Sequence, residues 1–460
     1  MKEIFGLLRA GERWINGLVW GVPAMALMLG VGVGLSLLCG FPQFTRFGRM
    51  LRCLVGGGKE GKKGVSSLQA MCTALAGSVG TGNIAGVAGA ITVGGPGAVF
   101  WMWVSALAGM CTKFVEVTLA VRFRERGRDG QWVGGPMYYI RKGLGRRWQW
   151  LGGVFALFGA LAAFGIGNLT QIHTVVSAVK TAADGLLTLG KEQEIALSLA
   201  VGILCAATVS AVLVGGVKRV GEVCAYLVPV MALGYTLAAG AVIISRAEAI
   251  PEAFSAILRG AFSPQAVIGG AAGITVRSAI TMGVGRGIFS NEAGLGSAPI
   301  AHAAAEVSHP AEQGLYGMLE VFIDTVVICT LTALVILLGV EEIPYGTDAG
   351  AELTISGFQA VFAGPLPAMI VAVSIALFAL ASVISWGFYG SSCCRYLLGS
   401  GAAGVYQRVF AAFAVVGAVM ELGTVWDLAD TLNGLMALPN LTALLALSPV
   451  AAQLCRESGK

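Results

Sequence analysis

The sequence predicts an all-α integral membrane protein with eleven transmembrane helices. Of its 460 residues, 56% are hydrophobic and only 12% are charged, whereas a soluble protein carries about 25% charged residues. Many apolar runs reach the roughly 20 residues that a helix needs to span a bilayer. Two of these runs are broken by glycine-rich stretches, at residues 77–83 and 283–294. Helix breaks are tolerated at membrane depth only where protein or a water-filled cavity satisfies the freed backbone groups, so both stretches are candidate functional sites.

The remaining composition argues against other kinds of site. The ten cysteines are scattered, mostly inside apolar runs, and form no C-x-x-C pair, so we expect them to pack helices rather than form disulfides or hold a metal. The three histidines show no metal-ligand spacing. The net charge of +5 reflects loops rather than a nucleic-acid partner. No signal-peptide cleavage pattern follows the first apolar run, which is therefore expected to be a retained span.

The apolar runs divide into eleven expected spans, and the turn GGPG at residues 94–97 joins the second span to the third. The spans are expected near residues 17–40, 68–93, 97–121, 151–179, 195–215, 222–245, 267–293, 316–339, 366–396, 405–424 and 431–454.

Orientation follows from Lys and Arg, which concentrate in cytoplasmic loops. The loops at residues 46–63 and 122–147 are the richest in these side chains. We therefore expect a multi-pass protein of the plasma (inner) membrane, with the N-terminus outside and the C-terminus in the cytoplasm.

The spacing of the two breaks predicts an internal repeat. If the first span is an accessory helix, the broken spans are the first and sixth of the remaining ten, and they enter the membrane from opposite sides. This is the spacing of a LeuT-like five-plus-five inverted repeat. We expect an accessory helix and cytoplasmic linker at residues 1–67, a first repeat at 68–245 and a second repeat at 246–460.

The first break carries polar and glycine residues in close succession, namely Gly80, Thr81, Gly82 and Asn83. The run GTGNIA at 80–85 superficially matches a dinucleotide fingerprint, but that motif needs a preceding strand, and here the context is a membrane span. One alternative is a glycine-packed helix crossing. The other, which we favour, is an unwound stretch whose amides hold a carboxylate, because a helix N-terminus is positive and has free N–H groups.

The second break places Phe289, Ser290, Asn291 and Glu292 at membrane depth. Backbone carbonyls exposed there would suit an ammonium group. An intramembrane carboxylate is a functional hypothesis by default. Glu292 could equally cap the broken helix and hold its two halves together, and both alternatives stay open at this point.

Polar residues of other spans complete the candidate site. Gln171 could donate to a carboxylate, although amides also link helices; for His173 we favour the linking role. In the ninth span, Ser382 offers a hard oxygen for a small cation, although serines in helices often bond to their own backbone. Asp324 could line an ion path or pair locally. Ser-His-Asp, HExxH and phosphate-loop patterns are absent from the sequence, so we expect no enzyme.

Several long motifs closely resemble the alanine/glycine:cation symporter family. The resemblance extends over about residues 15–450. Its motifs are TALA at 73–76 followed by VGTGNIAGVA at 79–88, GGPGAVFWMW at 94–103, GGPMYYI at 134–140, SNEAGLGSAPIAHA at 290–303 and NGLMALPN at 433–440.

The resemblance implies a LeuT-like fold that moves alanine or glycine with Na⁺, or sometimes with H⁺. It also implies an amino-acid site. Residues that match the family's site are Gly80, Thr81, Gly82, Asn83, Gln171, Phe289, Asn291, Ser382 and Trp386.

The sequence departs from the family pattern at three places. Ala381 replaces a hydroxyl expected near the cation, and Ser385 adds a hydroxyl elsewhere. Ser391 stands where the family usually has a carboxylate. Gln171 is followed by Ile-His at 172–173, where members commonly have Ala-Asn.

These observations together predict a symporter for a small zwitterionic amino acid. Amides at Gly82 and Asn83 would receive the carboxylate, with help from Gln171. Carbonyls near Phe289 and Ser290 would receive the ammonium group. Phe289 and Trp386 would wall a small side-chain pocket.

The coupling ion is expected to be Na⁺, held by Ser382 and by carbonyls near Ala76 and Val79; no other cofactor is expected. One alternative is H⁺ coupling, with Glu292 or Asp324 as the titrating group. Another is a membrane sensor that binds an amino acid without transporting it. The sequence makes no prediction about oligomeric state.

Overall fold

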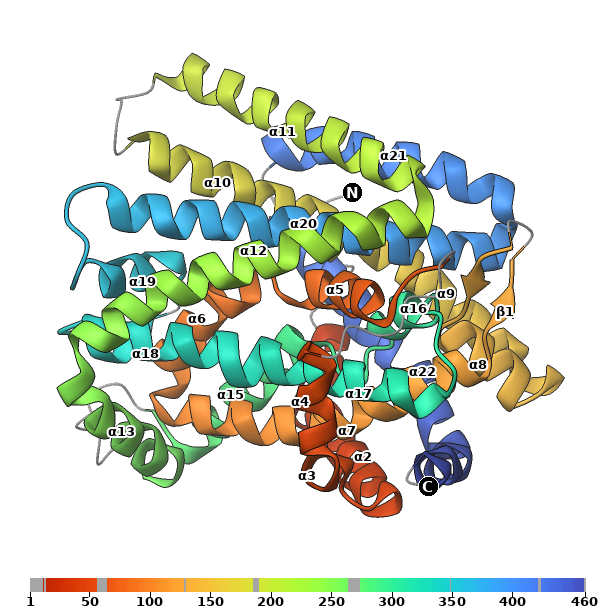
Figure 1. The fold of residues 1–460 in the computed structure, drawn as a ribbon. Coiled ribbons are helices and arrows are strands. Elements are labelled where there is room, and N and C mark those ends of the chain that lie inside the picture. The colour runs from red at the N-terminus through yellow and green to blue at the C-terminus, as the bar shows by residue number, and fades with distance from the viewer. Residues whose placement is uncertain are drawn as a thin grey trace.

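The computed structural model describes residues 11, 14–55, 64–127, 130–184, 190–263, 274–347, 349–420 and 423–458. Within these residues the chain is helical apart from loops and one two-stranded hairpin (Figure 1). Nine of the described helices are long and apolar enough to cross a membrane, so the chain is a multi-pass membrane protein. These helices are Trp14–Cys39, Gly97–Arg122, Arg146–Ala183, Lys191–Val214, Gly216–Ser245, Pro310–Gly339, Leu366–Leu398, Ser400–Val419 and Leu428–Glu457.

The longer helices are joined by short helices and turns. In chain order the elements are α2 (Val22–Cys39), α3 (Pro42–Thr45), α4 (Phe47–Val55), α5 (Ser67–Ser78), η1 (Thr81–Asn83), α6 (Ala85–Gly94), α7 (Gly97–Arg122), β1 (Glu125–Arg126), β2 (Trp132–Val133), α8 (Pro136–Gly143), η2 (Arg146–Trp148), α9 (Gln149–Phe164), η3 (Gly165–Leu169), α10 (Thr170–Asp184), α11 (Lys191–Val214), α12 (Gly216–Ser245), η4 (Ala247–Ala249), α13 (Ile250–Phe262), α15 (Val276–Asn291), α16 (Ala298–His302), α17 (Pro310–Val321), η5 (Phe322–Cys329), α18 (Thr330–Gly339), α19 (Ala351–Phe358), α20 (Leu366–Leu398), α21 (Ser400–Val419) and α22 (Gly423–Glu457).

Two helical segments are interrupted. The first consists of α5, the 3-10 turn η1 and α6, and the second consists of α15 and α16 with an irregular stretch at residues 292–297 between them. The break expected over residues 283–294 is therefore wrong in its extent, because α15 remains helical through Asn291. α6 packs against α15, and α5 packs against α16. The two broken segments therefore run in opposite directions, as can be followed in Figure 1.

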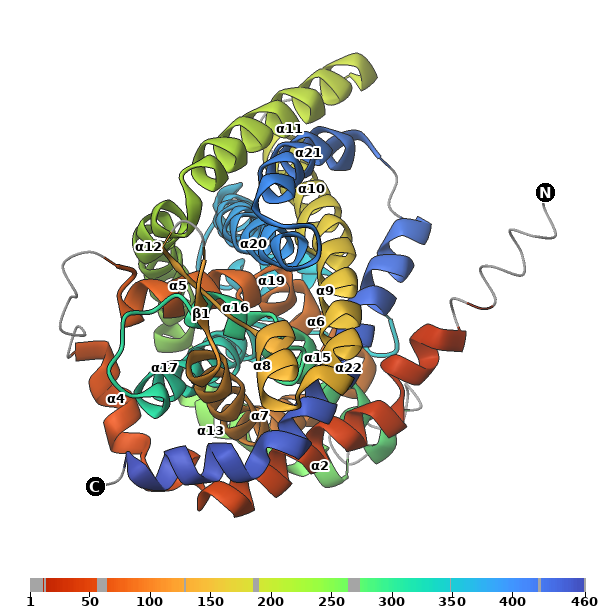
Figure 2. The same ribbon diagram turned by 90° about the vertical axis from the view of Figure 1, so that its right-hand side faces the viewer.

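Helix α7 is buried along nearly its whole length. It packs against α15 and α17 on one side, and α2 and α22 pack together against it along one edge in Figure 2. Glycines permit the approach of α15, because a Cβ atom at Gly283 would lie 2.3 Å from the backbone oxygen of Ala98. Small residues let membrane helices approach to backbone contact in this way.

The outer helices present apolar side chains to their surroundings. Leu204 on α11 and Tyr226, Leu237 and Ile244 on α12 are large, apolar and exposed. A soluble protein rarely exposes a continuous apolar surface of this kind, so these faces are expected to contact lipid.

The hairpin of β1 and β2 lies at the end of the fold where α5 begins, and its charged side chains contact one another and the neighbouring chain. Arg124 and Arg126 lie over the ring of Trp132, with guanidinium carbons 4.2 and 3.9 Å from the ring centroid. Arg126 also pairs with Glu306 at 3.3 Å, and the amide of Glu306 donates to the Val65 carbonyl at 2.8 Å. The hairpin thus holds together the chain before α5 and the chain after α16.

The expected turn at residues 94–97 is confirmed, since α6 ends at Gly94 and α7 begins at Gly97, with Gly95 at a φ of 76°. The loop expected at 216–221 is wrong. Gly216 has a φ of 69° and turns the chain directly into α12, a conformation that glycine adopts without steric cost. The first part of the seventh expected span, residues 267–273, lies outside the described residues.

The crossing of α7 and α15 generates a stability prediction. Gly283→Ala places a methyl group against backbone, and overpacking of this kind costs about 1–3 kcal/mol, so we expect a lower unfolding temperature in detergent. Gly285→Ala is the matched control, because its Cβ would meet only the Met25 sulfur at 3.4 Å. Equal unfolding temperatures for the two variants would contradict the close crossing.

Candidate functional site

The first break is held open by its own polar side chain. Gly80 is extended, with φ −141° and ψ −152°, and its N–H donates to Oδ1 of Asn83 at 2.9 Å. The side chain of Asn83 therefore satisfies a backbone group that the interrupted helix leaves free. Asn83 is itself fully buried.

Asp324 joins the two breaks. Nδ2 of Asn83 donates to Oδ1 of Asp324 at 2.7 Å, and Oγ of Ser290 donates to Oδ2 of Asp324 at 2.8 Å. Oγ1 of Thr325 donates to the same Oδ2 at 2.7 Å and accepts from Nδ2 of Asn291 at 3.1 Å. Of the two roles considered for Asp324, local pairing is the one seen in this geometry.

The position of Asp324 depends on a helical irregularity. The residue lies in η5, a π-helical stretch between α17 and α18. A second π-helical stretch, η3, directly precedes Thr170 and Gln171. Single π-helical turns inside α-helices occur frequently at functional sites, and both border the region where the helix breaks meet.

Three residues expected to hold a cation come together at the end of α5. Oγ of Ser382 on α20 lies 3.1 Å from the carbonyl oxygen of Ala76 and 3.4 Å from that of Val79. Both carbonyls belong to the last turn of α5 and the residue after it, where helix carbonyls lack intrahelical partners. Ser385, one turn further along α20, donates instead to the carbonyl of Thr73.

Gln171 lies beside the first break. A Cβ atom at Gly80 would lie 3.0 Å from Oγ of Ser382 and 3.7 Å from Oε1 of Gln171. Nε2 of Gln171 donates to the Ile166 carbonyl at 3.2 Å, and its buried Oε1 has no hydrogen-bond partner among the described residues. His173 hydrogen-bonds the backbone of Met420, in agreement with a helix-linking role.

The two expected aromatic wall residues have different neighbours. Phe289 lies over the first break, since a Cβ atom at Gly82 would be 3.6 Å from its ring. Trp20 of the first long helix lies 5.8 Å from Phe289 between ring centroids, a neighbour that sequence reasoning missed. Trp386 is buried and packs its ring 5.7 Å from that of Tyr389.

The polar residues of the second break lie within the protein rather than in open space. Glu292 ends α15 in the left-handed conformation, φ 54°, and its carboxylate accepts from the hydroxyl of Ser297 beyond the break. Its geometry is therefore that of the capping alternative. Asn291 caps the adjoining turn, with Oδ1 accepting from the Ala293 amide at 3.0 Å.

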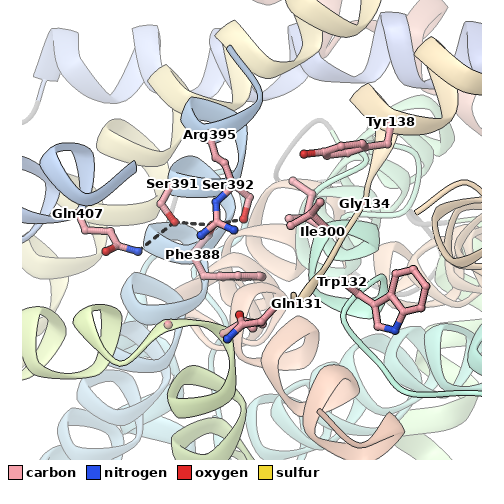
Figure 3. A pocket seen from close by; sticks show the side chains of 13 residues that line it. Gln131, Trp132, Gly134, Tyr138, Ile300, Phe388, Ser391, Ser392, Arg395 and Gln407 are labelled. Carbon is pink, nitrogen blue, oxygen red and sulfur yellow. Dashed lines mark hydrogen bonds between the residues drawn. The ribbon is translucent and has the colours of Figure 1, made fainter. Parts of the chain in front are cut away.

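A separate cavity lies at the C-terminal end of α20, under the hairpin (Figure 3). Ser391 and Arg395 of α20, Gln407 of α21 and Gln131 of the hairpin line it, and Nε2 of Gln407 donates to Oγ of Ser391 at 3.5 Å. Ser391 is the position where the family pattern has a carboxylate. Neither break contributes a lining residue, so this cavity is distinct from the candidate site.

The Asp324 pairing can be tested by stability. Asp324→Ala removes the acceptor of three buried donors, each of which costs about 1–3 kcal/mol when left unsatisfied, so we expect a large fall in unfolding temperature. Asp324→Asn keeps the shape and one acceptor oxygen, and should cost less. Wild-type stability of Asp324→Ala in detergent would show that the bonds to Asn83 and Ser290 contribute little.

Comparison of the sequence with known proteins identifies the family of the chain. The model of the "Sodium:alanine symporter family" matches residues 7–458. The chain is 42% identical over 444 residues to the sodium/alanine symporter AgcS of Methanococcus maripaludis, covering 95% of this chain and 94% of that protein. It is 41% identical over 436 residues to the amino-acid carrier protein AlsT of Bacillus subtilis, covering 94% of this chain and 89% of that protein.

A solved structure supports the fold independently. MhsT in complex with L-phenylalanine aligns with a TM-score of 0.55 and 14% identity, covering 87% of this chain and all of that one. At this identity the likeness concerns the fold alone. The match over nearly the whole chain confirms the resemblance seen in the motifs: the chain belongs to the sodium:alanine symporter family, whose members are transporters rather than enzymes.

Proposed function

We propose that the chain is a secondary active symporter that imports a small neutral amino acid, alanine or glycine, together with Na⁺. The observation that carries the proposal is the meeting of Gly80, Gln171 and Ser382 beside the first break. Broken helices at the midplane are where such transporters place substrate and ion. Relatives named as sodium/alanine and amino-acid carriers support the substrate class.

The first break would hold the substrate carboxylate. In the 3-10 turn η1 the amide of Asn83 donates to the Gly80 carbonyl at 3.3 Å, so the Gly82 amide is the more available of the two proposed donors. Thr81, the first residue of this turn, directly precedes Gly82. Nε2 of Gln171 has a second hydrogen, beyond the one given to Ile166, for the same carboxylate.

The second break would hold the ammonium group. Carbonyls near Phe289 and Ser290 provide acceptors, and Asn291 orients the turn that presents them. Phe289 and Trp386 would wall the side-chain pocket, with Phe289 packed over Gly82. A wall of this kind would admit alanine and glycine and exclude large side chains.

Na⁺ would be bound by Ser382 and the carbonyls of Ala76 and Val79. The Ser382 hydroxyl lies within 3.4 Å of both carbonyl oxygens. An ion bound between these three groups would therefore have three oxygen ligands. Small hard cations prefer oxygen ligands. Inward movement of the ion would be driven by the membrane potential, about 2.3 kcal/mol per charge per 100 mV, and by its concentration gradient.

We also propose eleven membrane crossings in two inverted repeats, at residues 68–245 and 246–460, after an accessory helix within 1–67. The two broken segments would add to the nine long helices to make eleven. Their antiparallel arrangement, with α6 against α15 and α5 against α16, supports the inversion. H⁺ coupling is the second candidate, favoured by the buried carboxylates of Asp324 and Glu292 beside the breaks.

Uptake into proteoliposomes tests the function. Radiolabelled alanine and glycine should accumulate saturably under an inward Na⁺ gradient, and less under Li⁺ or H⁺ gradients imposed separately. Unlabelled leucine and phenylalanine should compete poorly. Alanine binding without accumulation under any gradient would instead indicate a sensor.

The proposed cation ligands predict that substitutions at two adjacent positions change the half-saturating Na⁺ concentration in opposite directions. Ser382→Ala should raise the half-saturating Na⁺ concentration by at least about tenfold, since loss of one contact to a charged group is worth about 1.5–3 kcal/mol. Ala381→Ser restores the hydroxyl of the family pattern and should lower that concentration. The measurement is Na⁺-dependent alanine uptake; if neither variant changes it, the Na⁺ assignment is abandoned.

Orientation is tested by cysteine labelling in cells. Single cysteines placed in the loops at 46–63 and 122–147 should react with an impermeant reagent only from the cytoplasm, because their Lys and Arg favour that side. A cysteine at Lys191, at the start of α11, is the matched control and should react from outside. The reverse pattern would overturn the proposed topology.

A further inference from the structure

A group of charged side chains lies buried beside the second break. Lys113 and Glu116 are on α7, Glu320 is on α17 and His302 is on α16, and all four are fully buried. Nζ of Lys113 lies 3.4 Å from Oε1 of Glu320. Glu292, at the second break, is also buried and interacts electrostatically with Lys113.

His302 has polar partners at both ring nitrogens. Nε2 of Gln313 donates to the Ser67 carbonyl at 3.3 Å and lies 2.8 Å from Nδ1 of His302. Nε2 of His302 lies 3.0 Å from Oε2 of Glu320.

The group is short of positive charge. Its two basic side chains, Lys113 and His302, stand against the carboxylates of Glu116, Glu292 and Glu320. Glu320 has both Lys113 and His302 as partners. An ionised side chain left unpaired at membrane depth is costly, so the excess negative charge requires a ligand that neutralises it.

Glu116 is hydrogen-bonded only to neutral donors. Its Oε1 accepts from the Gly294 amide at 3.1 Å and from Nδ2 of Asn440, both neutral donors. Its Oε2 is buried and has no hydrogen-bond partner among the described residues. A buried polar atom without a partner indicates a missing ligand or water.

A metal ion does not fit this place. In the described part of the chain, no group of three or more His, Cys, Asp or Glu side chains is arranged to hold a metal. The nearby ammonium of Lys113 would also repel a cation. A proton neutralises a carboxylate without needing a coordination shell.

We propose that Glu116 is a proton-binding site, and that it is protonated in the conformation described here. The titratable and charged groups that face it are Lys113 on its own helix, Glu320 on α17 and, through Asn440 of α22, Tyr139 on α8. Behind these, Glu292 at the second break interacts with Lys113, and His302 on α16 interacts with Glu320.

The site is connected directly to the second break. Glu116 accepts from the Gly294 amide, while Nδ2 of Asn440 donates both to Glu116 and to the Gly294 carbonyl at 2.8 Å. Oε1 already accepts two hydrogen bonds, so loss of the proton would leave a negative charge on a buried carboxyl whose Oε2 has no donor among the described residues. Deprotonation should therefore disfavour this conformation and slow a transport cycle that passes through it.

The experiment measures Na⁺-driven alanine uptake with equal pH on both sides of the proteoliposome, and so rests on the proposed function. Between about pH 6 and about pH 9, a range in which buried carboxyls titrate, wild-type uptake should fall on the alkaline side, by up to about tenfold per pH unit for one proton. Glu116→Gln, a mimic of the protonated acid, should lose this fall. Glu312→Gln, the same change at an exposed position of α17, should keep it.

Lys113→Met tests the direction in which the pH dependence of uptake shifts. Removing the nearby positive charge strengthens proton binding by the remaining carboxylates, so the alkaline fall should move to higher pH. An unchanged pH profile in Glu116→Gln would overturn the proposal.

A spectroscopic measurement covers the case in which the variants do not fold. The purified wild-type protein should show an infrared carbonyl band of a protonated buried carboxyl that disappears on alkaline titration. Absence of any such band would overturn the proton site even if uptake is normal. Conversely, a band with no Na⁺-driven uptake would leave the proton site standing and overturn the proposed transport.

Discussion

Backbone groups freed inside a bilayer must find partners within the protein, and the crossing of the two broken helices depends on how this is achieved. Asn83 takes the free N–H of Gly80 with its side-chain oxygen and gives its amide hydrogens to Asp324 and Ser290. Asp324 accepts from both breaks at once. A single carboxylate on a third helix thereby sets how the two interrupted segments face each other.

The same constraint explains the surroundings of the first break. The carbonyls at the end of α5 have no following helical turn to bond, and Ser382 of α20 lies against two of them. A cation with an oxygen shell could take over these contacts. The carbonyls that lack intrahelical hydrogen bonds at the break are thus also the groups best placed to bind an ion.

Close packing of the helices fixes the positions of the buried polar residues relative to one another. Gly283 and Gly287 let α15 approach the backbone of α7, and α7 in turn carries Lys113 and Glu116 toward α16 and α17. Because helices in a membrane gain little from excluding water, small residues and buried hydrogen bonds contribute much of their association. The buried charges of α7 are therefore part of the packing as well as a candidate proton site.

The sequence by itself determined the membrane class, most of the spans and the position of the first break, because hydropathy, glycine content and loop charge are local properties. It placed the start of the second break too early, because Gly283 and Gly287 pack α15 against α7 without ending the helix. It also supplied the candidate residues Gly80, Gln171, Phe289 and Ser382. It missed the direct turn at Gly216, since a single glycine with positive φ replaces the connection expected between the spans at 195–215 and 222–245.

Only the tertiary structure decided which polar residues are partners. Asn83 and Asp324 are 241 positions apart, and Asp324 reaches Asn83 from a π-helical stretch that hydropathy does not reveal. Likewise, Glu116 meets Gly294 and Asn440 only because α7, the second break and α22 converge. Such pairings depend on the rotation and crossing of whole helices, which are set by packing over many side chains rather than by any local pattern.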